Sequence, residues 1–405
     1  MVEQLLHRLL HWLLHRLLNW KRINNMIKKE INEIKSLFDT IQDCGITRLA
    51  GCYVDGEKVK VKTFSGPFYN LPEEEMHKYL EIFRKTLSGT PGKNLLDMEF
   101  KNPENETEYG RSMLISLKKS ELKDDSLLEQ FYDKVIETYE YTGNYLILLI
   151  HQAYDVPGVT TDGIEMEDAS DEVYSYILCS ICPMKLTKPG LGFDDALGEI
   201  HTLPQIFAVE LPDDGFLFPA FNDRSSDDNA LLYSSKRSDM LQDSFLENVL
   251  DVTTALPPKQ QKEGFTEFVS EVLGDERNFE TVLSIQENLK DTVQNKKTEN
   301  AGETIFFDKD TVRNVFEKSG VSREKLGTFD KKFDERFESE GVTERKLFAE
   351  NVAPVRNFEV RNKNMVLRVS SKHTDIIDTR VIDGKKCLVI ELTDDLTVNG
   401  IPVEG

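Results

Sequence analysis

The stretch Asn144-Tyr-Leu-Ile-Leu-Leu-Ile-His151 decides the fold of this chain. Its unbroken run of apolar and aromatic side chains leaves neither face of a strand polar, so it predicts a central strand that is buried on both faces. The acidic stretch 155–172 that follows predicts a long surface loop. Residues 173–184 and 216–221 predict further strands of the same sheet.

The residues before this strand predict a hairpin and two helices. Segments 46–54 and 57–64 have strand patterns and are joined by Asp55-Gly56, a strong turn signal. Leu71-Pro-Glu-Glu-Glu75 predicts a helix start, since proline and carboxylates suit the first turn, and the helix should run to about Leu87. Apolar spacing predicts a second helix within 118–141.

The second half of the chain changes from a helical to a strand pattern. Helical spacing predicts helices at 238–250, 258–273, 277–295, 308–319, 322–338 and 343–350. Asp308 is a predicted N-cap, and the polar stretch 295–303 is a predicted linker. Short strands are predicted at 357–361, 365–370, 376–382, 386–392 and 395–399.

We therefore expect an α+β protein in three parts. An N-terminal mixed β-sheet domain with flanking helices spans 26–235, a helical segment spans 236–352, and a small C-terminal β-meander spans 353–405. The 405 residues are enough for two to three domains with apolar cores of their own.

Composition excludes several classes of protein. No apolar run approaches the roughly 20 residues that span a bilayer, so no membrane span is expected. The net charge of −22 repels phosphate backbones, which disfavours direct DNA binding. The cysteine count is five, which is odd, and the spacing is irregular, as in reduced thiols of a cytoplasmic protein.

Residues 1–25 differ from the rest of the chain. LLHRLLHW at 5–12 is followed by LLHRLLNW at 13–20, an eight-residue repeat that does not keep one face of a helix. A metal-binding row of His7, His11 and His15, an amphipathic membrane-surface helix and a signal peptide are alternatives. We expect instead a mis-called start, with translation beginning at Met26.

Two groups of residues are candidate sites. Lys58, Lys60 and Lys62 alternate with valines, which would form either a nucleic-acid-binding stripe or a lysine-protected edge strand. His151 ends the apolar strand, and Asp223-Arg224 follows another strand. These three could form a catalytic site, or they could be a hydrogen-bonded histidine and a turn.

Other patterns favour structural roles. Cys179 and Cys182 have the spacing of a redox or zinc pair, but in a strand they point to opposite faces. The glycines and lysine of 89–93 do not match a phosphate loop. The acidic side chains Asp162, Glu165, Glu167, Asp168, Asp171 and Glu172 could bind a cation or form a solvated loop. No cofactor and no metal site is predicted.

Several long motifs resemble domain-of-unknown-function family 4317, a bacterial family. Among them are GCYVDGEK at 51–58, NYLILLIHQAYDVPG at 144–158, FLFPAFNDRS at 216–225 and TRVIDGKKCLVIEL at 379–392. The resemblance covers about 26–403 and leaves out the repeat. The family carries no assigned activity or catalytic residues, so the resemblance implies no function.

A second resemblance, in the order of elements, is to the bacterial 37-kDa nucleoid-associated protein family. This resemblance rests on the order of strand 216–221, a helix with Phe245-Leu246 and Val249-Leu250, a helix that begins at Gln260-Gln261, and the C-terminal strands. It implies association with the nucleoid, directly or through a partner. We therefore expect a cytoplasmic binding or scaffolding protein, with an enzyme using His151, Asp223 and Arg224 as the alternative.

Overall fold

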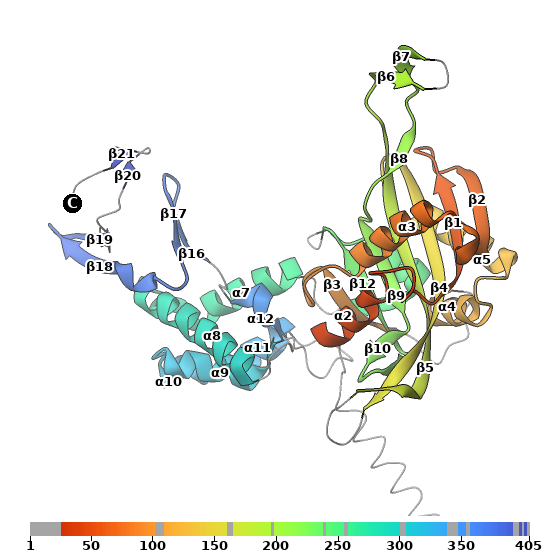
Figure 1. Cartoon of the computed structure of the whole chain (residues 1–405). Helices are drawn as coiled ribbons and strands as arrows, with labels where there is room; N and C mark the ends of the chain where they lie inside the picture. Colours follow the sequence, from red (N-terminus) through yellow and green to blue (C-terminus); the bar gives the residue numbers. More distant parts are fainter. Residues whose placement is uncertain are drawn as a thin grey trace, which may run out of the picture. The chain divides into compact units, whose positions relative to one another are not determined.

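The computed structural model describes residues 26–101, 109–159, 165–195, 198–237, 240–254, 258–299, 305–337, 347–353, 357–391, 397–398 and 401–402. The chain divides into two compact units, residues 1–255 and 256–405 (Figure 1). The repeat at 1–25, with His7, His11 and His15, lies outside the described residues.

The N-terminal unit is built on a nine-stranded sheet in which every neighbouring pair is antiparallel. Its order is β13-β3-β12-β9-β5-β4-β1-β2, with β8 on the far part of β5. The bounds are β1 Ile46–Val54, β2 Lys60–Pro67, β3 Leu95–Phe100, β4 Asn144–Val159, β5 Glu165–Leu186, β8 Phe207–Val209, β9 Asp214–Phe218, β12 Ala230–Ser235 and β13 Val252–Thr254. Two short hairpins accompany it, β6 Gly190–Asp194 with β7 Glu199–Leu203, and β10 Ala220–Asn222 with β11 Ser225–Asp227.

Helices cover both faces of the sheet, as the run at 144–151 predicts. Alternate β4 side chains enter two separate cores: Tyr145, Ile147 and Leu149 enter one, and Leu146, Leu148 and Ile150 the other. The first core also contains α4 Gly110–Lys119, α5 Asp125–Thr138, α6 Asp243–Phe245 and the π-helical turn Leu246–Leu250. The second contains α2 Lys28–Ser36 and α3 Glu73–Thr86. We call these the α4/α5 face and the α2/α3 face.

Several predicted elements of this unit are confirmed. β1 has the predicted bounds, Asp55-Gly56 lies in the β1–β2 turn, and α3 fills the predicted helix after Pro72. The predicted loop 155–172 is wrong, because β4 continues to Val159 and pairs with β5 from Glu165 onward. Charge alone suggested a loop there, but a two-stranded ribbon can carry acidic side chains on its solvated faces.

A buried carboxylate ties the α4/α5 layer to the sheet. Asp214 of β9 is buried, and it accepts hydrogen bonds from Tyr139 Oη and Tyr233 Oη, each at 2.8 Å. Burial raises the pKa of Asp214, while its bonds to the tyrosines lower it. Tyr139 follows α5 and Tyr233 lies in β12, so one side chain fixes a helix end against two strands.

The C-terminal unit begins as a helical cluster around phenylalanines. Its helices are α7 Pro258–Leu273, α8 Phe279–Glu299, α9 Lys309–Lys318, α10 Arg323–Leu326, α11 Phe329–Phe337 and α12 Ala349–Val352. The ring of Phe268 lies 5.1–5.8 Å from those of Phe316, Phe329, Phe333 and Phe337. The predicted N-cap is confirmed, since Asp308 Oδ1 accepts from Thr311 N at 2.8 Å. The predicted linker begins too early, because α8 continues to Glu299.

The C-terminal strands form separate hairpins rather than one meander. β16 Asn357–Arg361 pairs with β17 Val366–Ser370, β18 Ile377–Ile382 with β19 Lys385–Ile390, and β20 Thr397–Val398 with β21 Ile401–Pro402. The first two hairpins share a small core with α8, in which Phe279 meets Phe358 at 6.2 Å. These two hairpins therefore pack on α8, and neither extends the other into a larger sheet.

The predicted α+β class is confirmed, with a sheet that is antiparallel where a mixed sheet was expected. Along the chain, the first compact unit ends at Ala255, whereas the sequence suggested a domain boundary after residue 235. The difference arises because Phe245, Leu246 and Val249 belong to the α4/α5 core. Among the described residues, no helix is both long and apolar enough to cross a membrane.

Gly215 provides a test of this packing. A Cβ built there would lie 2.4 Å from Cys179 O and 2.6 Å from Thr86 Cγ2, so α3 and the sheet meet at a position without room for a methyl group. We expect Gly215→Ala to cost about 1–3 kcal/mol through overpacking. Thermal unfolding followed by circular dichroism measures this. Gly66→Ala, whose Cβ would meet nothing within 4 Å, is the control, and equal effects of the two would contradict the argument.

Candidate functional site

His151 is buried and lies in a chain of hydroxyl groups. Its Nδ1 is 2.7 Å from Thr47 Oγ1, and its Nε2 is 2.9 Å from Ser175 Oγ. Thr47 Oγ1 also donates to the main-chain oxygen of His151, which leaves the hydroxyl oxygen to accept from Nδ1–H. Nε2 is then unprotonated and accepts from Ser175. Burial lowers the pKa of His151, which keeps the ring neutral.

Asp223 and Arg224 are the central residues of the tight β10–β11 turn. Both have positive φ, 51° and 57°, as the two central residues of a type I′ turn require. Arg224 binds Glu33 of α2 through Nε and Nη2, at 2.9–3.3 Å, and Tyr154 Oη donates to the same carboxylate at 3.0 Å. The Arg224–Glu33 pair is about four-fifths buried, so it fastens α2 to the β10–β11 hairpin.

The structure does not join His151 to Asp223 or Arg224. His151 continues the β4 side chains on the α4/α5 face, and the charges nearest to it are Glu121, Lys123 and Lys118. Tyr154, the partner of the Arg224 site, packs on the α2/α3 face. Residues three apart on a strand point to opposite faces, so the predicted trio is split by the sheet.

The predicted lysine stripe is also divided. Lys58 lies in the turn with φ 63°, and β2 starts only at Lys60. The pairing of β1 with β2 is interrupted by a bulge, so that Lys62 is opposite Tyr53 and Lys60 is opposite Val54. Tyr53 and Val54 lie on opposite faces of the sheet, and the two lysines are therefore on opposite faces as well. Lys60 Nζ forms ion pairs with Glu129 at 2.5 Å and with Asp133 at 2.9 Å. Both carboxylates belong to α5, and they neutralise the charge of Lys60.

The predicted thiol geometry is confirmed, since Cys179 lies in the α4/α5 core and Cys182 in the α2/α3 core. Within the described part of the chain, no cluster of three or more potential metal ligands occurs. The side chains of Asp162, Glu165, Glu167, Asp168 and Asp171 lie outside the described residues. Glu172 accepts from Ser225 Oγ at 2.7 Å and so supports the β10–β11 turn.

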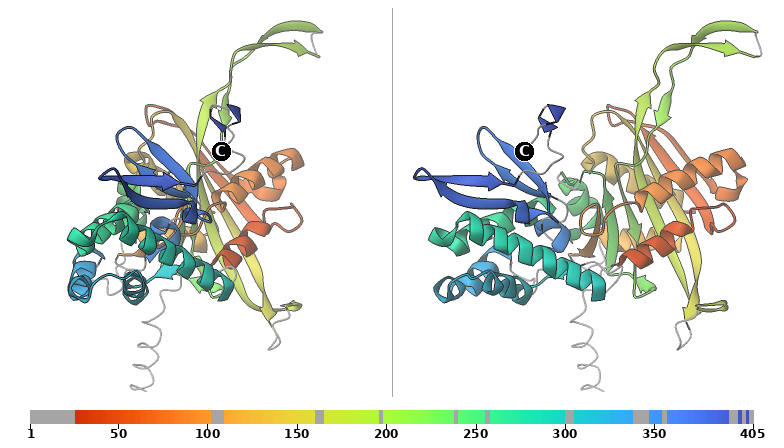
Figure 2. Two further views of the ribbon diagram at one scale, coloured as in Figure 1. Left: turned by 90° about the vertical axis from the view of Figure 1, so that its left-hand side faces the viewer. Right: turned by 60° about the vertical axis from the view of Figure 1, so that its left-hand side comes forward.

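Among the described residues of the N-terminal unit, a projecting two-stranded ribbon is the most exposed apolar feature. We call residues 184–211 the arm: the end of β5, β6, β7, β8 and the links between them. The arm leaves the sheet beyond the last β4 pair, Asn144–Met184 (Figures 1 and 2). Eight of its large apolar side chains are 41–74% exposed: Leu186, Leu191, Phe193, Ile200, Ile206, Phe207, Val209 and Leu211. Such a concentration is unusual on a chain that acts alone.

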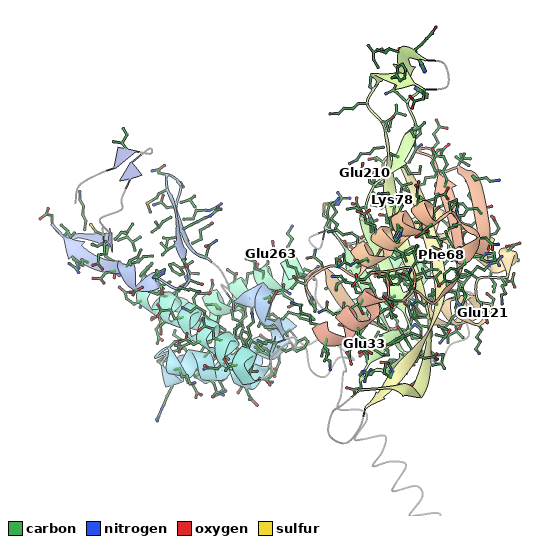
Figure 3. All side chains as sticks on the ribbon, viewed as in Figure 1. Glu33, Phe68, Lys78, Glu121, Glu210 and Glu263 are labelled. Carbon is green, nitrogen blue, oxygen red and sulfur yellow. The ribbon has the colours of Figure 1, made fainter. Side chains whose placement is uncertain are left out.

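A groove lies where the arm meets α3. Its volume is about 330 Å³, and its lining consists of Phe38, Asp39, His77, Leu80, Glu81, Arg84, Lys85, Ser88 and Leu211. Arg84 Nε pairs with Asp39 at 2.6 Å across it. Small-molecule pockets are enclosed and mainly apolar. This groove is charged and shallow, so it fits the rim of a protein interface better. Figure 3 marks Glu210, the residue that precedes Leu211, at the base of the arm.

Sequence reasoning did not identify the arm or the partners of His151. Gly190-Leu-Gly-Phe193 and Ile200-His-Thr202 alternate apolar with small or polar residues, and this signal could have revealed a one-sided ribbon. Thr47 and Ser175 are single hydroxyl residues within strands, and no pattern distinguishes them.

The hydrogen bond between Asp97 of β3 and Met26, just before α2, offers a test by pH. Its Oδ1 accepts from Met26 N at 2.9 Å, and burial, with the nearby charges of Glu30 and Asp227, raises its pKa to about 7. The folded state therefore binds a proton that the unfolded state releases near pH 4, and stability falls as pH rises from 4 through 7. At pH 8 we expect Asp97→Asn to stabilise the protein by on the order of 2–4 kcal/mol.

The measurement is the thermal midpoint between pH 4.5 and 8. Asparagine keeps an oxygen that can accept from Met26 N, so only the charge is removed. Glu74→Gln, at an exposed position of α3, is the matched control. A pH dependence that Asp97→Asn leaves unchanged would rule out this carboxylate as its source.

Comparison with known proteins identifies the family. The model of the family described as Domain of unknown function (DUF4317) matches residues 26–401, nearly the whole chain, and this confirms the resemblance seen in the motifs. The comparison with curated proteins gives no match. The similarity in element order to the nucleoid-associated family stays a prediction. The chain belongs to the Domain of unknown function family DUF4317.

Proposed function

We propose that this protein is a cytoplasmic binding or scaffolding protein that holds a protein partner on its arm. The observation that carries the proposal is the concentration of exposed apolar side chains on a ribbon that no described helix of its own unit covers. An isolated two-stranded ribbon is marginally stable in water and gains stability when its apolar face is covered. A partner protein supplies that cover.

The position of the arm supports a binding role. Met184, at its base, still packs against the α2/α3 core, whereas Leu186, two residues further on the same face, is half exposed. The arm thus begins where the helix layer ends, and it is held by β5, which is paired on both sides within the sheet. A rigid base of this kind fixes the direction in which the apolar face is presented.

Charge and thiols bear on the partner and the compartment. The Lys60 ion pairs with Glu129 and Asp133 remove one of the predicted DNA contacts, so nucleoid association would run through a bound protein. All five cysteines are unbridged, which supports a reducing compartment.

A second candidate function is an enzyme with a serine nucleophile. Its support is the Ser175–His151–Thr47 chain, in which a neutral imidazole can accept the proton of Ser175. A nucleophile, a base within hydrogen-bond distance and a group that orients the base are the parts of such a site. Thr47 carries no charge, so it would stabilise an imidazolium only weakly. We therefore place this function second.

The binding function is tested by photo-crosslinking in bacterial cells. With a photo-reactive phenylalanine at Phe193 of the full chain, we expect one protein adduct of defined mass. The adduct should be lost when Leu191→Asp is added and kept when Val59→Asp is added. Val59 is a suitable control because it is exposed and lies in the same unit. No adduct at Phe193, or one insensitive to Leu191→Asp, would refute binding through the arm.

The enzyme alternative is tested by labelling with a fluorophosphonate, a probe that forms a covalent bond with activated serines. A nucleophilic Ser175 would be labelled at pH 8, and labelling would fall at least tenfold in Ser175→Ala and His151→Gln. Ser65→Ala is the control, at a strand serine that bonds Arg48. We expect no Ser175-dependent labelling, because the Ser175 bond mainly fixes the buried ring. Labelling that both variants abolish would reverse the order of the two functions.

A further inference from the structure

We infer that the partner on the arm is a second copy of this chain, whose arm packs against the first through the same apolar face. The inference rests on the proposed function, because it names the protein that the arm would hold.

The β6–β7 ribbon has two unlike faces. Its register pairs Leu191 with Thr202 and Phe193 with Ile200, so these four side chains lie on one face. Gly190 and Gly192 lie on the other face, where they pair with Leu203 and His201. A Cβ at Gly190 would meet nothing within 4 Å. The ribbon therefore carries Leu191, Phe193 and Ile200 on one face, and two glycines interrupt the other face.

The exposed area matches what a stable dimer needs. Eight exposed large apolar side chains, spread over the whole arm, together expose on the order of 800 Å², about the area that each partner contributes to a standard protein interface. A monomer rarely carries apolar patches of more than a few hundred Å². A second arm has the same chemistry and the same area, so it can cover this surface without a partner of any other kind.

The backbone of the ribbon is also available for pairing. β6 pairs only with β7, and β8 pairs only with β5, so each keeps an unpaired edge in the described sheet. Exposed strand edges accept strands of another chain. A contact through one patch on both copies is isologous and closes at two chains.

The charge of the arm permits the contact despite the net charge of −22. Residues 184–211 contain two lysines and four acidic residues, so the arm carries only a small part of the chain's negative charge. At its base Lys185 Nζ pairs with Glu210 at 3.5 Å. At 0.15 M salt, charges further away than about 8 Å are screened, and the acidic body of one copy repels the other only weakly at the arm.

The first experiment measures the mass of the purified full chain by sedimentation and light scattering from 1 to 100 µM, the concentration range in which dimers of ~µM affinity form. We expect twice the chain mass of 46.5 kDa. The double variant Phe193→Asp with Ile200→Asp should weaken the dimer at least about 30-fold, the loss typical of central interface side chains. Val59→Asp and Val381→Asp, at exposed valines that are not part of the arm, should leave it unchanged.

A second measurement tests proximity without introducing charge. Ile200→Cys in a Cys387→Ser background should give a covalent dimer on mild oxidation, and Val59→Cys in the same background should not. A chain that is monomeric at 100 µM, a dimer that the arm variants leave intact, or no covalent dimer overturns the inference. If the Phe193 adduct formed in cells contains a different protein while the purified chain is monomeric, the inference fails and the binding function stands.

Discussion

The burial of β4 on both faces is the constraint on which the rest of the N-terminal unit depends. A strand with apolar side chains at every position from Tyr145 to Ile150 is stable only between two layers, and α2/α3 and α4/α5 supply them. The hydroxyl network of His151 lies at the end of this run, where the strand first carries a polar side chain. On β4, polar side chains therefore follow only where this apolar run ends.

The length of β5 explains why the arm is exposed. Its 22 residues extend over about 70 Å, whereas α3, the longest helix on its α2/α3 face, has 14 residues and measures about 21 Å. No helix of that length can cover the whole strand. Near Met184 the β4 pairing and the helix layer end together, and apolar residues continue into the arm without cover. The exposed face is thus a consequence of the mismatch between strand and helix lengths.

The sequence predicted those elements whose signals are local. The β4 run, the Pro72 and glutamate start of α3 and the Asp308 cap each depend on neighbouring residues, and all three are confirmed. The site residues depend on distant ones. Thr47 and His151 are 104 positions apart, and Arg224 and Glu33 are 191 positions apart. The bulge that separates Lys60 from Lys62 has no sequence signal, because it arises from the register of β1 against β2.

The strongly acidic surface and the apolar arm are compatible because they act over different distances. Net charge opposes random association of whole molecules and so limits aggregation through the arm's exposed edges. Apolar contact acts only at the arm, which carries two lysines and four acidic residues and thus little of the net charge of −22. A heterologous contact, with the arm of one copy in the α3 groove of the next, would leave one arm free and could propagate. The groove is lined by Asp39, Glu81, Arg84 and Lys85, and an apolar ribbon would bury those charges at a cost. Arm-to-arm pairing avoids that cost and uses both adhesive faces at once, so the closed dimer is the favoured arrangement.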